Sequence, residues 1–325
     1  MNPCFASIDV GTHTTRLLIA HLDNHILTPV LIQRVITKLG MSFESGYIDE
    51  ASIKKLIETL KTYSTLMQRY QIQGYQAVGT AVLRKAKNKD LVLHAIHQET
   101  GLTLEVIEGK TEAHLTAKGV LSTLEIEEKP LLIADIGGGS TELIWIGENE
   151  FVKSLPLGAT WLTRSFLKSD PPVPEEVKKA FHAAIEVIST QTSFLFPALL
   201  IGTAGTVSTL AAIDLKMTVY QPYLVNGYVL SQKRVEEIFS SLARFPASAR
   251  TSIPGLEPGR EEIILGGTII LLGLLETFKQ DKLIVSEGGL LEGILVNYLE
   301  KNTGKRNLKF TIRRQTDGDK RSINL

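Results

Sequence analysis

The sequence predicts an α/β fold made of two similar domains with a cleft between them. The length of 325 residues favours two domains. Stretches that read as strands alternate with stretches of helical period, which is typical of α/β proteins. The segment "ASIDVGTHTTRLLIA" (residues 6–20) aligns without a gap with "LIADIGGGSTELIWI" (residues 132–146). Both copies read as strand, small polar turn and strand. A motif duplicated so far apart indicates two related domains rather than a solenoid.

The first half of the chain continues with alternating elements after this hairpin. Apolar residues recur at helical spacing over 49–70, and 74–84 reads as a strand that leads into a turn. Residues 102–109 are expected to form a strand, and 111–124 a helix. The polar, charged segment 124–130 is the expected domain boundary.

The second half repeats the alternation after its own copy of the hairpin. Residues 152–158 read as a strand, and 171–189 as a helix opened by prolines. Residues 198–212 and 282–299 each read as strand, glycine turn and helix. The expected division is therefore a first domain over 1–124, a second over 125–303, and a basic, mobile tail over 304–325.

The composition limits the classes of function. The 35 basic and 35 acidic residues balance, so we expect no nucleic-acid partner. The apolar run 263–275 is too short to cross a membrane, and the N-terminus has no pattern of a signal peptide. Cys4 is the only cysteine, which suits a reducing compartment, and we expect a cytoplasmic protein. Cys4 itself is expected to be a small core residue, with no histidine context that would make it a nucleophile.

The duplicated turns have the composition of phosphate sites. Glycine lets backbone N–H groups approach an anion closely, and serine and threonine add hydroxyl donors. The predicted phosphate ligands in the paired turns are Thr12, His13, Thr14 and Thr15, together with Gly137, Gly138, Gly139, Ser140 and Thr141. A further turn, "GTAGT" over Gly202–Thr206, adds Gly205 and Thr206 at a helix N-terminus, where the dipole favours anions. One such turn alone is as consistent with a tight loop, but three of them after apolar strands favour phosphate binding.

Carboxylates flank these turns and suggest a metal ion. Asp9 falls on Asp135 in the repeat, and Glu142 follows the second turn. Carboxylate oxygens are the ligands that Mg²⁺ prefers, and the metal would offset the repulsion between carboxylates and phosphate. The sequence therefore predicts Mg²⁺, or another divalent cation, at Asp9, Asp135 and Glu142.

The chain resembles the exopolyphosphatase and guanosine pentaphosphate phosphohydrolase family, Ppx/GppA, up to about residue 302. The matching stretches are "IDVGTHTTRLLIA", "GTAVLRKAKN", "VIEGKTEAHLTAKGV", "LLIADIGGGSTELIWIG", "LPLGATWLTRSFLKSDPP" and "VSEGGLLEGIL". The family lies within the actin and hexokinase superfamily, so the resemblance implies two RNase H-like (actin-like ATPase) domains in a short, two-domain form.

The resemblance also implies roles for individual residues. The glutamate of "EGKTEAHL" that precedes alanine acts as general base in such proteins, and it falls on Glu112. The acidic residues around the glycine turn bind the metal and phosphate region, which falls on Asp135 and Glu142, and the arginine of "GTAVLR" is linked to substrate binding, which falls on Arg84. His13 stands where the family has asparagine, and Leu291 where it has arginine.

The expected function is that of an exopolyphosphatase, which shortens inorganic polyphosphate from its end as orthophosphate. The alternatives are hydrolysis of the guanosine pentaphosphate alarmone, a kinase or ATPase of the wider superfamily, and a non-catalytic alarmone sensor. The lysines beside Arg84 (Lys85, Lys87 and Lys89) are expected to be a solvated face or a guide for a polyanion. A homodimer is an open possibility for the assembly.

Overall fold

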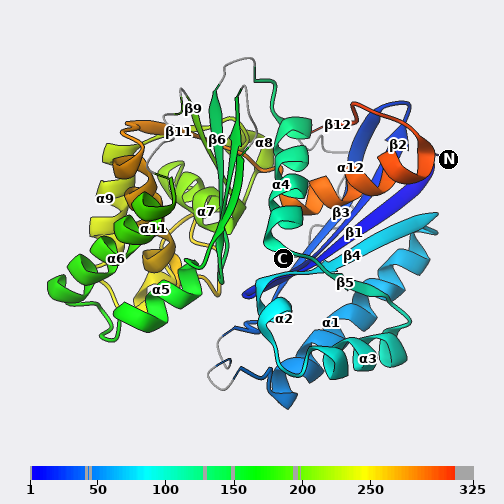
Figure 1. Ribbon diagram of the computed structural model, residues 1–325, viewed down its shortest axis with the longest axis horizontal. Helices are drawn as coiled ribbons and strands as arrows, with labels where there is room; N and C mark the ends of the chain where they lie inside the picture. Colours follow the sequence, from blue (N-terminus) through cyan, green and yellow to red (C-terminus); the bar gives the residue numbers. More distant parts are fainter. Residues whose placement is uncertain are drawn as a thin grey trace. The chain divides into compact units, whose positions relative to one another are not determined.

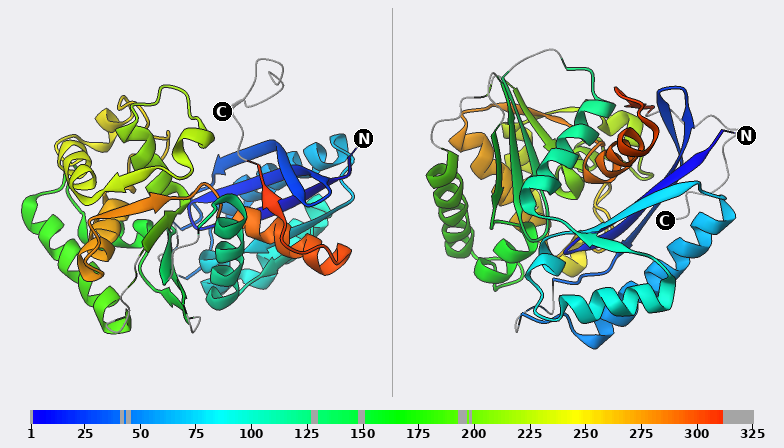
Figure 2. Two further views of the ribbon diagram at one scale, coloured as in Figure 1. Left: turned by 90° about the horizontal axis from the view of Figure 1, so that it is seen from above. Right: turned by 45° about the vertical axis from the view of Figure 1, so that its right-hand side comes forward.

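The computed structural model describes residues 2–40, 43, 46–126, 130–147, 151–192, 197 and 199–311. The chain divides into two compact units, which we call unit 1 (Met1–Glu125 with Gly288–Leu325) and unit 2 (Ile126–Glu287). Over the described ranges each unit contains one six-stranded sheet with helices packed on it (Figures 1 and 2). Among these residues no helix is both long enough and apolar enough to cross a membrane.

Unit 1 combines the beginning and the end of the chain. Its elements are β1 (Cys4–Val10), β2 (Thr14–Asp23), β3 (Ile26–Ile36), α1 (Glu50–Arg69), β4 (Gly74–Gly79), α2 (Ala81–Lys85), α3 (Lys89–Thr100), β5 (Leu104–Val106), α4 (Gly109–Thr123), α12 (Leu290–Thr303) and β12 (Lys309–Phe310). The strand order is β12-β3-β2-β1-β4-β5. Helices α1 and α3 cover one face of this sheet, and α4 and α12 cover the other (Figure 1).

Unit 2 is a single continuous stretch of chain. Its elements are β6 (Leu131–Ile136), β7 (Thr141–Ile146), β8 (Phe151–Leu155), α5 (Ala159–Phe166), α6 (Pro174–Thr192), β9 (Leu199–Thr203), α7 (Ala204–Asp214), α8 (Pro222–Val225), β10 (Val229–Ser231), α9 (Gln232–Leu242), α10 (Ala247–Arg250), α11 (Ile264–Thr277) and β11 (Lys282–Val285). The strand order is β10-β11-β9-β6-β7-β8. The apolar run noted in the sequence is α11, a core helix buried along most of its length.

The two sheets share one topology. The order β3-β2-β1-β4-β5 of unit 1 recurs in unit 2 as β8-β7-β6-β9-β11. In both, the first three strands pair antiparallel and the last three pair parallel. The strands β1 and β6, which begin the two copies of the repeat, are buried along their whole length. Strands covered on both faces read as continuous apolar runs, which explains the sequence of both copies.

Helix α12 corrects the expected division of the chain. Residues 288–303 were expected in the second domain, but α12 packs on the sheet of unit 1, where Ser7 Oγ donates to the Leu291 carbonyl at 2.7 Å. Helices α4 and α12 also meet backbone to backbone. A Cβ on Gly119 would lie 1.8 Å from the Gly289 carbonyl oxygen, and a Cβ on Gly293 would lie 1.7 Å from that of Leu115. Only glycine fits at this crossing.

Three local expectations also change. The segment after β4 is the short helix α2 rather than a turn. The beginning of the expected tail is ordered, because β12 pairs with β3 and Phe310 is buried; residues 312–325 lie outside the described residues. Cys4 is buried as expected, but its Sγ lies 3.0 Å from the Nδ1 atom of His21, its partner across the β1–β2 pair, so a histidine does lie nearby. Burial raises the pKa of the Cys4 thiol.

Candidate functional site

Each sheet carries one glycine-containing turn at the end of its central strand. In unit 1 the turn joins β1 to β2, and the Gly11 N–H donates to the Thr14 carbonyl at 2.9 Å. In unit 2 the turn joins β6 to β7, and the Gly137 N–H donates to the Ser140 carbonyl at 3.0 Å. The same closing hydrogen bond therefore occurs in both units, so the repeat in sequence is also a repeat in backbone geometry.

The turn of unit 2 offers a group of backbone donors. The N–H groups of Gly138, Gly139 and Ser140 donate to no residue within the described part of the chain. The carbonyl side of this turn is occupied, since Gly138 O accepts from the Thr160 N–H at 2.9 Å at the start of α5. Successive N–H groups in a glycine turn form a concavity that suits an anion. The turn therefore uses its carbonyl groups in hydrogen bonds to α5, and its N–H groups can donate to an anion.

Two predicted phosphate ligands use their hydroxyl groups inside their own unit. The Oγ1 atoms of Thr15 and Thr37 lie 3.1 Å apart, and Thr141 Oγ1 donates to the Leu157 carbonyl at 2.6 Å. Both Thr15 and Thr141 are fully buried. These two hydroxyl groups therefore already have a partner within their own unit. Thr15 and Thr141, the second hydroxyl residues of the two turns, already belong to the strands that follow. Because successive side chains in a strand point to opposite faces, each of them points away from the side of its preceding neighbour.

The carboxylate of Asp9 is paired within unit 1. Its Oδ2 accepts from Arg16 Nη2 at 2.6 Å and from Arg16 Nε at 3.0 Å. Burial lowers the pKa of the Arg16 guanidinium, but the carboxylates of Asp9 and Glu292 together raise that pKa above its ordinary value. The Asp9 Oδ1 atom is buried and has no hydrogen-bond partner among the described residues. A buried carboxylate oxygen of this kind suits a cation or a water molecule.

The corresponding position of unit 2 carries a second carboxylate in place of an arginine. Asp135 lies directly opposite Glu142 across the β6–β7 pair, as Asp9 lies opposite Arg16 across β1–β2. Both carboxylates are buried, and Glu142 Oε1 accepts from Ser154 Oγ at 2.7 Å. Like charges directly opposite each other in a sheet are destabilising. A bound cation would relieve this repulsion, so the pair fits a divalent metal.

The three carboxylates predicted to bind metal do not form one cluster within a unit. Asp9 belongs to unit 1, whereas Asp135 and Glu142 belong to unit 2. No group of three or more metal-binding side chains gathers anywhere in the ranges that the structure describes. The two carboxylates of unit 2 suit Mg²⁺ nonetheless, because this ion usually keeps several waters and takes only one or two carboxylates.

Glu112 and Arg84 lie together in unit 1. Glu112 is in the first turn of α4, and 9% of its side chain is exposed. Arg84 at the end of α2 donates from Nη1 to Glu112 Oε2 at 3.1 Å and to the Ile107 carbonyl at 2.6 Å. The carboxylate is thus held in one orientation by a guanidinium that is itself anchored to the backbone. Two residues that are far apart in sequence, both predicted for the site, are brought into contact.

Comparison with known proteins identifies the family. The model of the Ppx/GppA phosphatase family matches residues 18–302, which is most of the chain. The protein belongs to the Ppx/GppA phosphatase family. The crystal structure of the Aquifex aeolicus member is similar to the chain with a TM-score of 0.79 and 34% sequence identity, over 92% of this chain and 99% of that one. The expected pair of actin-like domains is thereby confirmed.

Curated relatives carry different names. The bifunctional 3-dehydroquinate synthase/phosphatase of Fusobacterium nucleatum is 33% identical over 89% of this chain and 46% of its own length, so the chain spans about half of that protein. Exopolyphosphatase 2 of Mycobacterium tuberculosis is 29% identical over 90% of this chain and 97% of its own length. Guanosine-5'-triphosphate,3'-diphosphate pyrophosphatase of Aliivibrio fischeri is 26% identical over 98% of this chain and 65% of its own length.

The two residues that differ from the usual Ppx/GppA motifs, His13 and Leu291, are both buried. His13 is buried, and its backbone carbonyl accepts from the Lys38 N–H at 2.9 Å. Leu291 packs in an apolar cluster with Phe5 and Leu18 against the sheet of unit 1. A leucine therefore contributes packing at a position where an arginine would need charged or polar partners.

Arg260 is a member of the candidate site that sequence reasoning missed. Helix α7 begins in the "GTAGT" turn, and a Cβ on Gly205 would lie 1.9 Å from the Arg260 Nη2 atom. Arg260 is buried, and its Nε donates to Glu257. The other predicted ligand of this turn, Thr206, places its hydroxyl group against Gly267 of α11. The "PGR" segment has no periodicity that would have linked Arg260 to this turn.

Proposed function

We propose that the protein is an exopolyphosphatase that hydrolyses the terminal phosphoanhydride bond of inorganic polyphosphate and releases orthophosphate. The observation that carries this proposal is the turn of unit 2, where the donors of Gly138, Gly139 and Ser140 adjoin the carboxylate pair Asp135–Glu142. Donors for phosphate oxygens next to ligands for a cation are what phosphoryl transfer requires. The full-length similarity to exopolyphosphatase 2 of M. tuberculosis supports this substrate.

Each group has a role in this proposal. Glu112 orients the attacking water and accepts its proton, and Arg84 holds the carboxylate in place. The N–H groups of the unit 2 turn bind the oxygens of the phosphoryl group that is transferred. Asp135 and Glu142 would hold Mg²⁺, which supplies charge neutralisation when bound. Substitution of either Glu112 or Asp135 should then slow hydrolysis.

Guanosine pentaphosphate is the second candidate substrate. The guanosine-5'-triphosphate,3'-diphosphate pyrophosphatase of A. fischeri is similar over nearly the whole chain, and its name concerns this kind of compound. Both substrates end in a phosphoanhydride, and the turn donors serve either. A kinase transfers the phosphoryl group to an acceptor other than water, so it would not need a water-activating glutamate such as Glu112. A sensor would not need Glu112, Asp135 and Glu142 together.

The test measures phosphate release from polyphosphate, guanosine pentaphosphate and ATP side by side, with Mg²⁺ and with a chelator. Polyphosphate should be hydrolysed fastest, and only with the metal present. Faster release from pentaphosphate would replace the proposed substrate by the alternative. Tight alarmone binding without any hydrolysis would favour the sensor.

The role of Glu112 is tested with Glu112→Gln, which keeps the shape of the side chain and removes its basicity. A positioned base contributes about 10²–10⁴-fold in rate, so kcat should fall by that factor while polyphosphate still binds. Glu58→Gln, at an exposed position of α1, is the matched control and should retain the original kcat. Near-normal turnover of Glu112→Gln would move the base elsewhere, with Glu142 as the next candidate.

We further propose a cytoplasmic location and a homodimeric state. The single cysteine suits a reducing compartment. Light scattering of the purified protein measures the assembly directly, and a monomer across the working range of concentration would overturn the second of these proposals.

A further inference from the structure

Unit 2 carries an apolar groove between three of its helices. Helices α6 and α9 both pack against α11 (Figure 1), and the groove at this junction has a volume of about 470 Å³. Its apolar lining comes from all three helices and the residue after α9: Val177, Phe181, Phe239, Ala243, Ile269 and Leu272. Pockets that hold small molecules have volumes of about 300–1,000 Å³ and mostly apolar walls. The groove therefore has the size and the lining of a small-molecule site.

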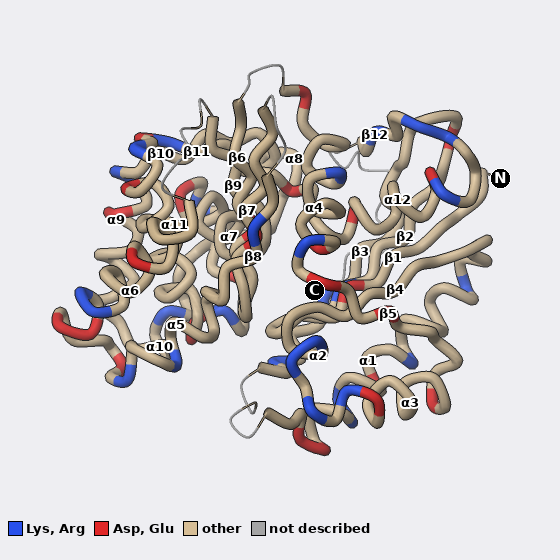
Figure 3. The backbone as a smooth tube through the Cα atoms, viewed as in Figure 1, with Lys and Arg blue, Asp and Glu red and all other residues tan. Residues whose placement is uncertain are grey.

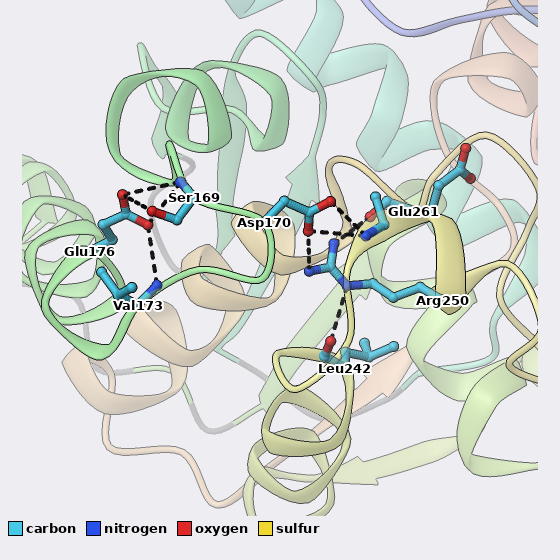
Figure 4. A network of polar contacts seen from close by, with 8 residues as sticks. Ser169, Asp170, Val173, Glu176, Leu242, Arg250 and Glu261 are labelled. Atoms are coloured by element: carbon cyan, nitrogen blue, oxygen red, sulfur yellow. Dashed lines mark hydrogen bonds and ion pairs between the residues drawn. The ribbon is translucent and has the colours of Figure 1, made fainter.

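The rim of the groove is held by the segment that precedes α6. This segment contributes Pro172 and Pro174 to the rim, and proline fixes the backbone angle φ. Asp170 in the same segment accepts from the Ala247 N–H at 2.8 Å and from Arg250 Nη2 at 3.3 Å (Figure 4). These contacts connect the α6 side of the rim to the chain that follows α9. A site that is already formed binds its ligand without the cost of ordering the chain.

Two cations also line the groove, Lys178 on α6 and Arg244 after α9. Both are exposed, and neither side chain forms an ion pair or a hydrogen bond with any residue in the described ranges. Glu175 of α6 pairs with Lys179 instead, at 3.9 Å. Figure 3 shows the acidic start of α6 as a red segment and the basic stretch after it as a blue one. Because no carboxylate is found among the described lining residues, an anionic group would meet only positive charge here.

The lining restricts the kind of ligand. Among the described lining residues, none has a neutral side chain that can form hydrogen bonds. A nucleotide base or a sugar would therefore lose its hydrogen bonds to water without replacement. Inorganic phosphate has no apolar part that could fill the groove. A saturated hydrocarbon chain has no hydrogen bonds to lose and gains from every methylene that leaves water. The lining and the charge together favour a molecule with an apolar chain and one anionic end.

We propose that this groove binds a fatty carboxylate of medium chain length. The hydrocarbon chain packs between Phe181, Phe239 and Ile269, and the carboxylate lies at the rim beside Lys178 and Arg244. None of the residues assigned to phosphate hydrolysis belongs to the described lining of the groove, so this site does not depend on the proposed function.

Isothermal titration calorimetry of the full chain with hexanoate, octanoate and octylammonium tests the proposal. Octanoate should bind, and hexanoate should bind roughly fifteenfold more weakly, because each buried methylene contributes about fourfold in affinity. Octylammonium has the same hydrocarbon chain with the opposite charge, and it should give no heat of binding.

The double variant Lys178→Gln/Arg244→Gln removes both charges of the groove. The dissociation constant for octanoate should rise roughly two- to thirtyfold, as expected from the loss of two exposed charge contacts. The matched control is Lys179→Gln/Lys233→Gln, two exposed lysines of α6 and α9 outside the lining that give the same change in charge. Octanoate should bind this control as tightly as it binds the unaltered protein.

Three results would overturn the inference. They are equal affinities of octanoate for the double variant and its control, binding of octylammonium as tight as that of octanoate, and no heat of binding for octanoate. A second copy of the chain that covers the groove would give the last result, together with a dimer in light scattering that the double variant loses. Phosphate release should be the same in the double variant and the unaltered protein, so failure of the proposed function leaves this test unaffected.

Discussion

Arg250, a buried arginine of unit 2, gives the sharpest prediction on stability. Arg250 is 2% exposed and bridges three segments of the chain (Figure 4). Its Nε donates to the Leu242 carbonyl at 3.0 Å, its Nη1 to the Glu261 carbonyl at 2.8 Å, and its Nη2 to Asp170 Oδ1 at 3.3 Å. The Asp170 carboxylate also accepts from the Ala247 N–H. Burial lowers the pKa of Arg250, and Asp170 opposes that effect.

The substitution Arg250→Met keeps an unbranched apolar chain and removes every donor. It leaves the Leu242 and Glu261 carbonyls without this donor, and each buried acceptor left unsatisfied costs about 1–3 kcal/mol. The contact to Asp170 contributes little, because the Asp170 side chain is half exposed. For a domain of this size, each kcal/mol lowers Tm by about 2–4 °C. The summed loss of about 2–6 kcal/mol should therefore lower the unfolding transition of unit 2 by roughly 4–24 °C.

Differential scanning calorimetry of the whole chain measures this shift. The control is Arg244→Met, an exposed arginine at the end of α9, which should lower Tm by no more than about 2 °C. If both variants unfold at the temperature of the unaltered protein, the network around Arg250 contributes nothing to stability and the reasoning from burial fails.

Two further predictions concern the glycine crossing and the metal. Gly119→Ala places a Cβ 1.8 Å from the Gly289 carbonyl oxygen, so α4 and α12 must separate, and unfolding in urea should show a loss of about 1–3 kcal/mol or more; unchanged stability would mean that the crossing is looser than described. Asp135→Asn removes one of two opposed carboxylates, so the Mg²⁺ concentration for half-maximal phosphate release should rise about tenfold or more; an unchanged Mg²⁺ dependence would remove Asp135 from the proposed metal site.

The sequence alone was sufficient to predict those features of the fold that depend on a local pattern of residues. The repeated hairpin, the helix α1 and the strand–turn–helix of β9 and α7 all follow from periodicity and glycine punctuation within a short window. The pairing of Asp9 with a position on the next strand also follows from the turn. The residue at that position is Arg16 in unit 1 and Glu142 in unit 2. Both follow from the same alignment of the two hairpins once the register of the strand pair is known.

The features that the sequence did not reveal depend on contacts between distant segments. Helix α12 directly follows β11 in the chain, and nothing local shows that it packs on the other sheet. Its placement relies on Gly293 and Gly119 facing each other, which is a property of two helices together. Arg260 reaches the "GTAGT" turn from an irregular segment, and α2 is too short for helical periodicity to appear.

Unit 2 is inserted in the sequence of unit 1, and this has a consequence for folding during synthesis on the ribosome. Ser7 and Leu291, which meet in the finished fold, are 284 residues apart. At about 5–20 residues per second, β1 waits roughly 15–60 seconds for the helix that covers it. During this time Phe5, Leu18 and Leu22 lack their apolar partners on α12, although unit 2 can already fold as a continuous stretch. The nascent chain thus exposes part of one sheet face until synthesis is nearly finished, and exposed apolar surface of this kind is prone to aggregation.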